Sequence, residues 1–199
     1  MTRFPLDPTT AQVAGRTIPW RTTVRLTAPV LLFAALVSLG GMIRLYVPGN
    51  PIPFTLQVVF VLMAGGFLRP ASAMASMSLF LAAGFSGLPV FAGGGGGPAY
   101  LIGPSGGYLL GFMVAAPLVS LLIASRRDTF TRVVLAMAAG VLAIHVVGGL
   151  HLALYMGGAF ALALSTTAHF LPIDVVKVAA AAAVVSGGSS WMRRGSDRG

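Results

Sequence analysis

The sequence contains no cysteine and has few charged residues. Without cysteine, the chain can form no disulfide, no thiolate metal site and no cysteine nucleophile. Only 9% of its residues are charged while 56% are hydrophobic, which lies well outside the range of soluble globular domains. No G-x-x-x-x-G-K-[ST] sequence follows any glycine run, so the chain lacks a P-loop for ATP. These absences predict an integral membrane protein that binds no nucleotide of its own.

Apolar residues form six segments, as many as 199 residues can hold with short connections between membrane spans. The prolines of PGNPIP separate the first two, since proline removes a backbone hydrogen-bond donor. We expect an all-α integral membrane protein with one six-helix domain at residues 26–188, between a basic N-terminal segment, 1–25, and a basic tail, 189–199. The predicted spans are residues 26–47, 54–68, 71–88, 106–123, 133–160 and 172–185.

The basic residues that give the chain its net charge of +9 are distributed as in a membrane protein. They do not alternate with aromatic residues as a nucleic-acid site requires. Positive residues gather in short cytoplasmic loops. Three of the connections contain no lysine or arginine, so we expect them outside and both termini in the cytoplasm. The residues predicted to be cytoplasmic are Arg3, Arg16, Arg21, Arg25, Arg69, Arg126, Arg127, Arg132, Arg193, Arg194 and Arg198.

The outer stretch at residues 87–108 contains nine glycines. Glycine allows backbone to approach a ligand closely, while the three prolines of this stretch restrict the chain. A flexible spacer is the alternative, but aromatic side chains accompany the glycines and offer flat faces for a ligand. We expect a lid whose rings and backbone N–H groups contact a ligand, formed by Phe91, Gly93, Gly94, Gly97, Tyr100 and Tyr108.

Asp174 and Lys177 lie at the start of the last apolar segment, in the sequence LPIDVVK. A spacing of three residues places both side chains on one helical face. Ionisable residues within a membrane span are costly unless they meet each other, water or a ligand. A neutralised structural pair is the alternative to a ligand site. We favour the ligand site, because a carboxylate accepts N–H groups and an ammonium donates to a carbonyl, which suits a cyclic urea or amide.

Three further residues at the outer ends of spans are weaker candidates for ligand binding. Arg44 is suited either to clamp a carboxylate or to snorkel to lipid headgroups. Thr55 and Gln57 begin the second span, where each is suited to bond a ligand or cap the helix. His145 and His151 fall on different helical faces, so they predict no metal pair and each has a structural or interhelical role.

Ser105 lies in Gly103-Pro104-Ser105-Gly106-Gly107, which matches G-x-S-x-G. At the start of a fourth span, this motif resembles the nucleophile site of rhomboid intramembrane proteases. A serine nucleophile needs a histidine base beside it. The rhomboid pattern supplies that histidine from the sixth span, where this chain has none, so a serine protease is the disfavoured alternative.

Four motifs together resemble the BioY family, the biotin-specific capture (S) components of energy-coupling factor (ECF) transporters. They are P-x-P-F-T-L-Q at residues 51–57, G-L-P-V-F-A-G-G-x-G-G at 87–97, G-P-S-G-G-Y-L-L-G-F at 103–112 and F-L-P-x-D-x-x-K at 170–177. The resemblance covers residues 48–177 in the order of the family. Two positions depart from its pattern: Ile173 stands where a glycine is usual, and Gly95 where a larger or basic residue is frequent.

The resemblance implies capture of biotin from the outer side of a prokaryotic cytoplasmic membrane. It also implies a transmembrane coupling subunit and two ATPase subunits as partners, so that ATP is used only by those partners and this chain is not an enzyme. Another vitamin remains open as the ligand, as does a homo-oligomer as the working state. We expect no cofactor, metal or nucleic acid, with lipid and biotin as the other partners.

On this interpretation, Asp174 accepts a ureido N–H of biotin and Lys177 donates to a ureido or carboxylate oxygen. Phe91, Tyr100 or Tyr108 packs on the rings. Ala34 and Ser38 lie four residues apart on the first span, where small side chains allow another helix to approach closely. We therefore expect the coupling subunit to dock there.

Overall fold

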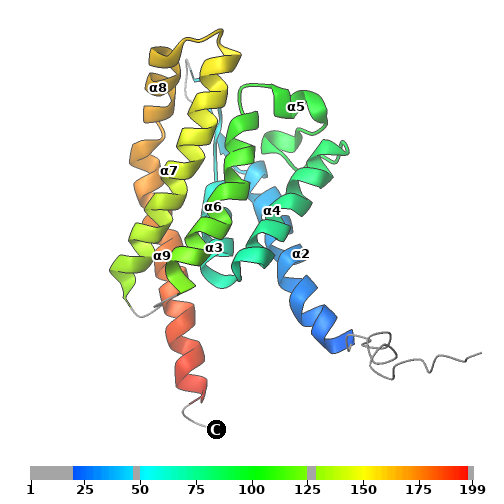
Figure 1. Ribbon diagram of the computed structural model, residues 1–199, viewed down its shortest axis with the longest axis vertical. Helices are drawn as coiled ribbons and strands as arrows, with labels where there is room; N and C mark the ends of the chain where they lie inside the picture. The colour runs from blue at the N-terminus through cyan, green and yellow to red at the C-terminus, as the bar shows by residue number, and fades with distance from the viewer. Residues whose placement is uncertain (1–19, 47–49, 125–128, 197–199) are drawn as a thin grey trace, which may run out of the picture.

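The protein is a bundle of helices in a computed structural model that describes residues 20–46, 50–124 and 129–196 (Figure 1). The long helices are α2 (Trp20–Met42), α3 (Gln57–Phe67), α4 (Pro70–Phe85), α6 (Gly106–Ala124), α7 (Phe130–Tyr155) and α9 (Leu171–Ser196). Shorter elements join them: strands β1 (Arg44–Leu45) and β2 (Phe54–Thr55), the 3-10 turn η1 (Ala92–Gly94), α5 (Pro98–Ile102) and α8 (Phe160–Ala168).

Three of the described helices are long and apolar enough to cross a membrane: Gly106–Ala124, Phe130–Tyr155 and Leu171–Gly188, with mean hydropathies of 2.1, 2.3 and 1.5. Three shorter apolar helices accompany them, Thr27–Met42, Gln57–Phe67 and Pro70–Phe85. Together they are compatible with the six predicted spans. At 1.5 Å per residue, α3 is only about 16 Å long, roughly half of a bilayer's hydrocarbon core. The helix α3 alone is therefore too short to cross that core.

The ends of the spans differ from the sequence prediction where tight turns intervene. The first span ends at Met42 instead of residue 47, because Arg44 and Leu45 pair with Thr55 and Phe54 in an antiparallel two-stranded sheet. The fifth ends at Tyr155 instead of residue 160, since Gly157 and Gly158 adopt φ values of 68° and 92° that break the helix. The last helix continues to Ser196, into the predicted basic tail.

Glycines allow α6 and α7 to pack closely. A Cβ atom at Gly111 would lie 2.9 Å from the Cα atom of Ile144, and one at Gly107 would overlap the Cβ atom of His151. On α7, a Cβ at Gly148 would overlap the ring of Tyr108. Small residues let membrane helices approach in this way, where packing rather than the hydrophobic effect holds helices together. At this close contact, the ring of Tyr108 lies directly against α7 at Gly148.

The three connections that are predicted to lie outside converge at one end of the bundle. Figure 1 shows α5, α8 and the strands together at the end opposite the C-terminus. Asn50 fastens the first connection to α8, since its side-chain amide donates to the carbonyl of Thr166 at 3.3 Å. The convergence that the sequence predicts for these connections is therefore present.

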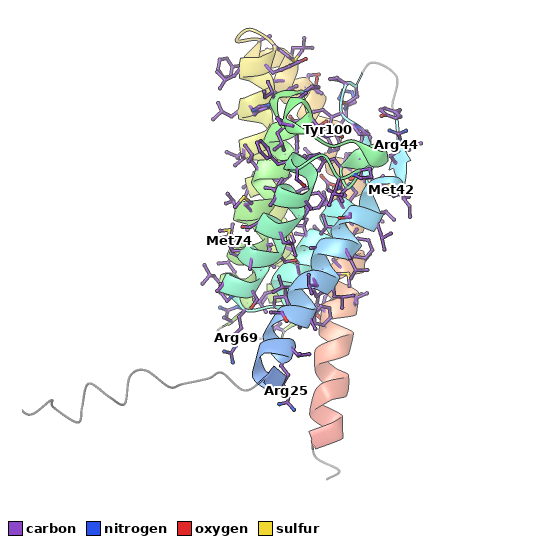
Figure 2. All side chains as sticks on the ribbon, turned by 90° about the vertical axis from the view of Figure 1, so that its right-hand side faces the viewer. Arg25, Met42, Arg44, Arg69, Met74 and Tyr100 are labelled. Atoms are coloured by element: carbon purple, nitrogen blue, oxygen red, sulfur yellow. The ribbon has the colours of Figure 1, made fainter. Side chains whose placement is uncertain are left out.

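The described basic residues separate along the bundle. Figure 2 shows Arg25 and Arg69 at one end, with Arg44 and Tyr100 near the other. This arrangement agrees with the predicted charge asymmetry for the residues that can be compared. The N-terminal segment up to residue 19 lies outside the described residues, and eight of the predicted cytoplasmic arginines have undescribed side chains: Arg3, Arg16, Arg21, Arg126, Arg127, Arg193, Arg194 and Arg198.

Gly84 on α4 makes room for the ring of Phe91. That ring is fully buried and packs edge-on against Phe80, with ring centroids 5.4 Å apart. A Cβ atom at Gly84 would overlap the Phe91 ring. The stretch after α4 is thereby fixed to the bundle by an aromatic side chain.

We predict that Gly84→Ala lowers the free energy of unfolding of the purified protein by about 1–3 kcal/mol, because the added methyl group overlaps the space that the Phe91 ring occupies. Thermal unfolding in detergent measures the loss. Gly187→Ala is the matched control, since its Cβ would meet nothing within 4 Å and alanine is the better helix former. An unfolding midpoint for Gly84→Ala equal to that of the control would contradict this packing.

Candidate functional site

A small cavity of about 50 Å³ lies beneath the connections at this end of the bundle. Side chains from several separate segments surround it, which is why residues far apart in the sequence meet there. Its lining includes Ile52, Pro53, Thr55, Gln57, Val58, Ala92, Tyr100, Ser105, Tyr108, Leu109, Phe112, Val141, Ile144, His145, Phe170, Asp174 and Lys177. Four of the polar lining residues come from α3, α7 and α9: Gln57, His145, Asp174 and Lys177.

The centre of the polar wall is a buried cluster of three ionisable side chains. Lys177 Nζ donates to Asp174 Oδ1 at 3.0 Å, across the predicted spacing of three residues on α9. His145 Nε2 from α7 meets Asp174 Oδ2 at 2.6 Å. Asp174 and Lys177 are 4% and 5% exposed, so neither charge reaches bulk water. Asp174 lies in the first turn of α9, where the helix dipole favours a negative charge.

Gln57 brings an unused hydrogen-bond donor to the same cavity. It is the first residue of α3 and is 2% exposed. Its Oε1 accepts from the hydroxyl of Thr55 at 3.4 Å, whereas its Nε2 has no partner in the described structure. A buried amide N–H without a partner costs stability. The donor therefore suits a ligand oxygen, and Thr55 orients the amide instead of capping the helix.

Aromatic rings form the side of the cavity next to the cluster. Phe170 stacks on Phe54 with ring centroids 4.4 Å apart, and it lies 5.9 Å from the rings of both Tyr108 and His145. The hydroxyl of Tyr108 is 2.7 Å from that of Thr167 on α8. These rings offer flat apolar faces beside a buried ion pair.

The lid segment, residues 86–105, closes the cavity through Ala92, Tyr100 and Ser105. The Tyr100 hydroxyl donates to the carbonyl of Ala92 at 3.4 Å. Burial raises the pKa of Tyr100 above its ordinary value, and Tyr46 adds to the effect. Tyr100 therefore remains a neutral phenol at physiological pH.

Phe91 and the lid glycines occupy other positions than those expected. Phe91 is 0% exposed and packs into the bundle, so it is not among the cavity's lining residues. The N–H groups of Gly94 and Gly97 donate to the carbonyls of Phe91 and Gly84 at 3.0 and 2.7 Å. Gly93 lies against the guanidinium of Arg44. In this structure these four residues shape the lid and are not among the lining residues of the cavity, so their contact with a ligand stays a prediction.

Arg44 likewise lies outside the cavity lining. Its Nη1 donates to the hydroxyl of Tyr46 at 3.1 Å, and the guanidinium lies over the ring of that tyrosine at 5.3 Å. Because Gly93 lies against the same group, Arg44 links the first outer connection to the lid. In this structure the guanidinium contacts these groups, and a role for Arg44 in binding a carboxylate stays a prediction.

Ala34 and Ser38 on α2, where we expected the coupling subunit to dock, make contacts within the chain. Ala34 is 7% exposed and belongs to the apolar core, while the hydroxyl of Ser38 donates to the carbonyl of Ala34 at 2.8 Å. Small side chains here serve packing within the chain. Ala34 is therefore not available on the surface for a partner, and the exposed face of α2 presents Leu31, Leu32, Leu39 and Met42.

Ser105 is not paired with a histidine. The three histidines of the chain bond elsewhere: His145 to Asp174, His151 to the carbonyl of Gly103, and His169 to the carbonyl of Ser165. A serine nucleophile requires a base within hydrogen-bond reach. The arrangement that a serine protease needs is not formed.

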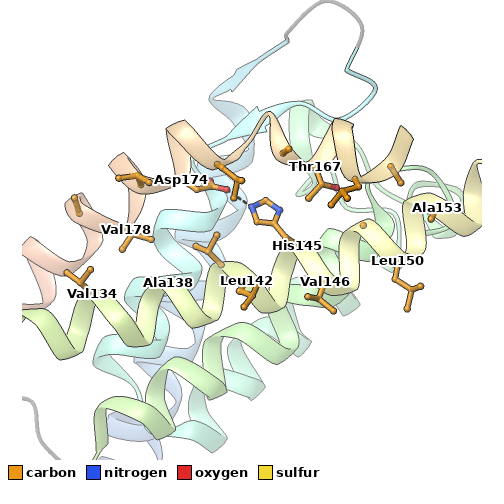
Figure 3. A pocket seen from close by; sticks show the side chains of 18 of the residues that line it. Val134, Ala138, Leu142, His145, Val146, Leu150, Ala153, Thr167, Asp174 and Val178 are labelled. Atoms are coloured by element: carbon orange, nitrogen blue, oxygen red, sulfur yellow. Dashed lines mark hydrogen bonds and ion pairs between the residues drawn. The ribbon is translucent and has the colours of Figure 1, made fainter. Parts of the chain in front are cut away.

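An apolar groove of about 910 Å³ runs along α7, α8 and α9 on the other side of the cluster. Figure 3 shows His145 and Asp174 meeting between these helices, flanked by Leu142, Val146 and Val178. Both members of this pair line the groove as well as the cavity. Their contact therefore forms part of the wall between the two.

His145 and Phe170 are the main site residues that sequence reasoning did not assign. The predicted interhelical role of His145 is confirmed, but its partner is the site carboxylate itself. The sequence signal for a site role of His145 was that it is an ionisable residue within a predicted span. Phe170 stood in the recognised F-L-P-x-D-x-x-K motif, yet nothing in the sequence indicated its stacking on Phe54.

Comparisons with known proteins agree on one family. A model described as the BioY family matches residues 11–194. The probable biotin transporter BioY of Pyrococcus horikoshii is 37% identical over 152 residues, covering 76% of this chain and 88% of that protein. The biotin transporter BioY of Lactococcus lactis is 31% identical and covers 76% of this chain and 83% of its own length.

Solved structures share the fold. The crystal structure of the S-component for biotin from an ECF-type ABC transporter superposes with a TM-score of 0.80 at 25% identity, over 85% of this chain and 93% of that one. An S component of a bacterial ECF transporter gives a TM-score of 0.53 at 11% identity, over 88% and 97% of the two chains, and shows the fold alone. These matches confirm the predicted S-component-like fold of a multi-pass membrane protein.

We predict that Lys177→Met destabilises the ligand-free protein by about 3 kcal/mol, because removing one partner of a buried ion pair leaves a poorly compensated charge. His145 still bonds Asp174, which limits the loss. The double variant Asp174→Asn with Lys177→Met should regain most of the stability, since neither charge remains. Chemical or thermal unfolding in detergent provides the measurement. A double variant no more stable than Lys177→Met alone would show that the pair is not the source of the loss.

Proposed function

Because this chain belongs to the BioY family, we propose that it captures biotin from the outer side of a prokaryotic cytoplasmic membrane for uptake. The observation that carries the proposal is the buried Asp174–Lys177 pair at a small cavity, beside the unpaired amide donor of Gln57. Relatives named biotin transporters support the choice of ligand.

The chemistry of biotin complements the polar wall. Its ureido ring carries two N–H donors and one carbonyl acceptor. Each oxygen of Asp174 has one partner, and a carboxylate oxygen can accept more than one hydrogen bond, so Asp174 can still receive a ureido N–H. Lys177 spends one of its three donors on Asp174, and Gln57 Nε2 is unpaired. Both can donate to oxygens of the ligand.

The apolar part of biotin suits the aromatic side. Phe170, Tyr108 and Tyr100 line the cavity and can enclose the fused rings. A cavity of about 50 Å³ is far smaller than the roughly 300–1,000 Å³ of ordinary ligand pockets. Capture therefore requires outward movement of the cover. The part of the lid segment that follows the anchored Phe91 is the natural moving part, since Ala92, Tyr100 and Ser105 contribute to the lining from a surface connection.

Any ATP-driven step of transport requires partners, since the chain has no P-loop. We propose a transmembrane coupling subunit and two ATPase subunits, with ATP used only by the latter and no enzymatic activity in this chain. The similarity to S components of ECF transporters supports this assembly. The separation of Arg25 and Arg69 from the cavity end supports cytoplasmic termini and an outward-facing site.

We predict that the detergent-purified chain binds labelled biotin and that excess thiamine or riboflavin does not displace it. Asp174→Asn should weaken binding about tenfold or more, the usual effect of losing a hydrogen bond to a charged group. Val176→Ala is the matched control, since this neighbour on α9 is 65% exposed and outside the cavity. Equilibrium binding measures all three proteins.

Absence of biotin binding by the wild-type chain would refute the proposed ligand. Displacement by thiamine or riboflavin would redirect the assignment to another vitamin. Wild-type affinity in a folded Asp174→Asn variant would remove this carboxylate from the binding site. The unfolding midpoint of each variant, measured in the same detergent, establishes that it is folded.

A further inference from the structure

We propose that His145 is a positioning residue, which holds Asp174 in the orientation that receives the ligand and shields its carboxylate from the lipid-facing groove. This role rests on the proposed function. It begins with the contact between α7 and α9, where His145 Nε2 meets Asp174 Oδ2 at 2.6 Å. The side chains are 10% and 5% exposed, so the hydrogen bond is protected from water.

The two oxygens of Asp174 have different partners. Lys177, on the same helix, takes Oδ1, whereas His145, on the facing helix, takes Oδ2. A carboxylate held at both oxygens by groups from two helices cannot turn about its side chain without breaking one bond. The remaining acceptor capacity of both oxygens therefore keeps a fixed direction. With Lys177 as the sole partner, Oδ2 would have no hydrogen bond and the carboxylate could rotate about its bond to the rest of the side chain.

The groove explains why the second oxygen needs a protein partner. The lining of the groove is apolar except for His145, Asp174 and Thr167. In a bilayer, lipid chains fill such a surface and offer no hydrogen-bond donor. An unsatisfied carboxylate oxygen there would favour rotation of the Asp174 side chain toward the cavity. His145 supplies the donor from the side where water is absent.

The surroundings of His145 fix the imidazole in turn. Its ring lies 6.2 Å from Tyr108 in an edge-to-face arrangement and 5.9 Å from Phe170. Both aromatic residues also line the cavity. Its Nδ1 is buried and has no partner in the described structure, so Nε2 makes the one hydrogen bond of the ring. The aromatic wall and the carboxylate are thus arranged by the same side chain.

The test is a set of biotin-binding measurements on His145→Leu, His145→Gln, Asp174→Asn and the double variant His145→Leu with Asp174→Asn. His145→Leu should weaken binding about tenfold or more, because Asp174 loses a hydrogen bond to a charged group. His145→Gln keeps an N–H donor of similar reach and should restore affinity to within about threefold of wild type. In the double variant, the leucine should add no loss beyond that of Asp174→Asn, because its effect passes through the carboxylate.

Leu142→Ala is the matched control. Leu142 lies on the same helix, is 64% exposed and lines the groove without lining the cavity. This variant alters the groove but not the contact with Asp174, and it should bind biotin as the wild type does. Loss of binding in this control equal to that in His145→Leu would assign the effect to the shape of the groove and overturn the proposal.

Other results also decide the question. Wild-type affinity in His145→Leu, no recovery in His145→Gln, or losses that add in the double variant would overturn a role through Asp174. Failure of the wild type to bind biotin would refute the proposed function and the positioning role with it. A wild type that binds while Asp174→Asn is weakened and His145→Leu is not would refute the positioning role alone.

Discussion

The buried carboxylate of Asp174 is the constraint on which the site depends. A charge 4% exposed within an apolar helix bundle is unstable without partners, so α7 and α9 must bring His145 and Lys177 to its two oxygens. This requirement fixes the spacing of those helices at the depth of the cavity. It also gives the chain a charged, dry and oriented group, which a purely apolar bundle cannot offer to a polar ligand.

The cavity lies where the bundle is irregular, at the end opposite the C-terminus. The short helix α3 begins with Gln57 deep in the molecule, and α9 begins with Asp174 in its first turn. A helix that begins inside the bundle places its first polar groups and the positive end of its dipole there. A full-length span would place only apolar side chains at the same depth. The strands, the lid segment and α8 then cover the gap. Glycines permit this cover to lie close to the helices, as the seat of Phe91 against Gly84 illustrates.

Much of this organisation was predictable from the sequence, because composition, arginine placement and the Asp174–Lys177 spacing each follow from one physical rule. The pairing on α9 occurs as the spacing predicts. Long-range packing was not predictable. Phe91, beside the glycines, has the composition of a ligand contact, yet its ring fills the space left by Gly84. Ala34 has the pattern of an exposed docking position but is buried in the core. His145 gave only a general signal, since its partner lies on a helix 29 residues away.

A structure of the chain with biotin bound is the most direct test of the role of Asp174. We expect a ureido N–H within hydrogen-bond distance of Asp174, about 2.7–3.2 Å between nitrogen and oxygen, with ligand oxygens near Lys177 Nζ or Gln57 Nε2. We also expect that the lid segment moves while the contact between His145 and Asp174 persists. Biotin bound away from α9, or with its carboxylate in place of the ureido ring at the Asp174–Lys177 pair, would contradict the account.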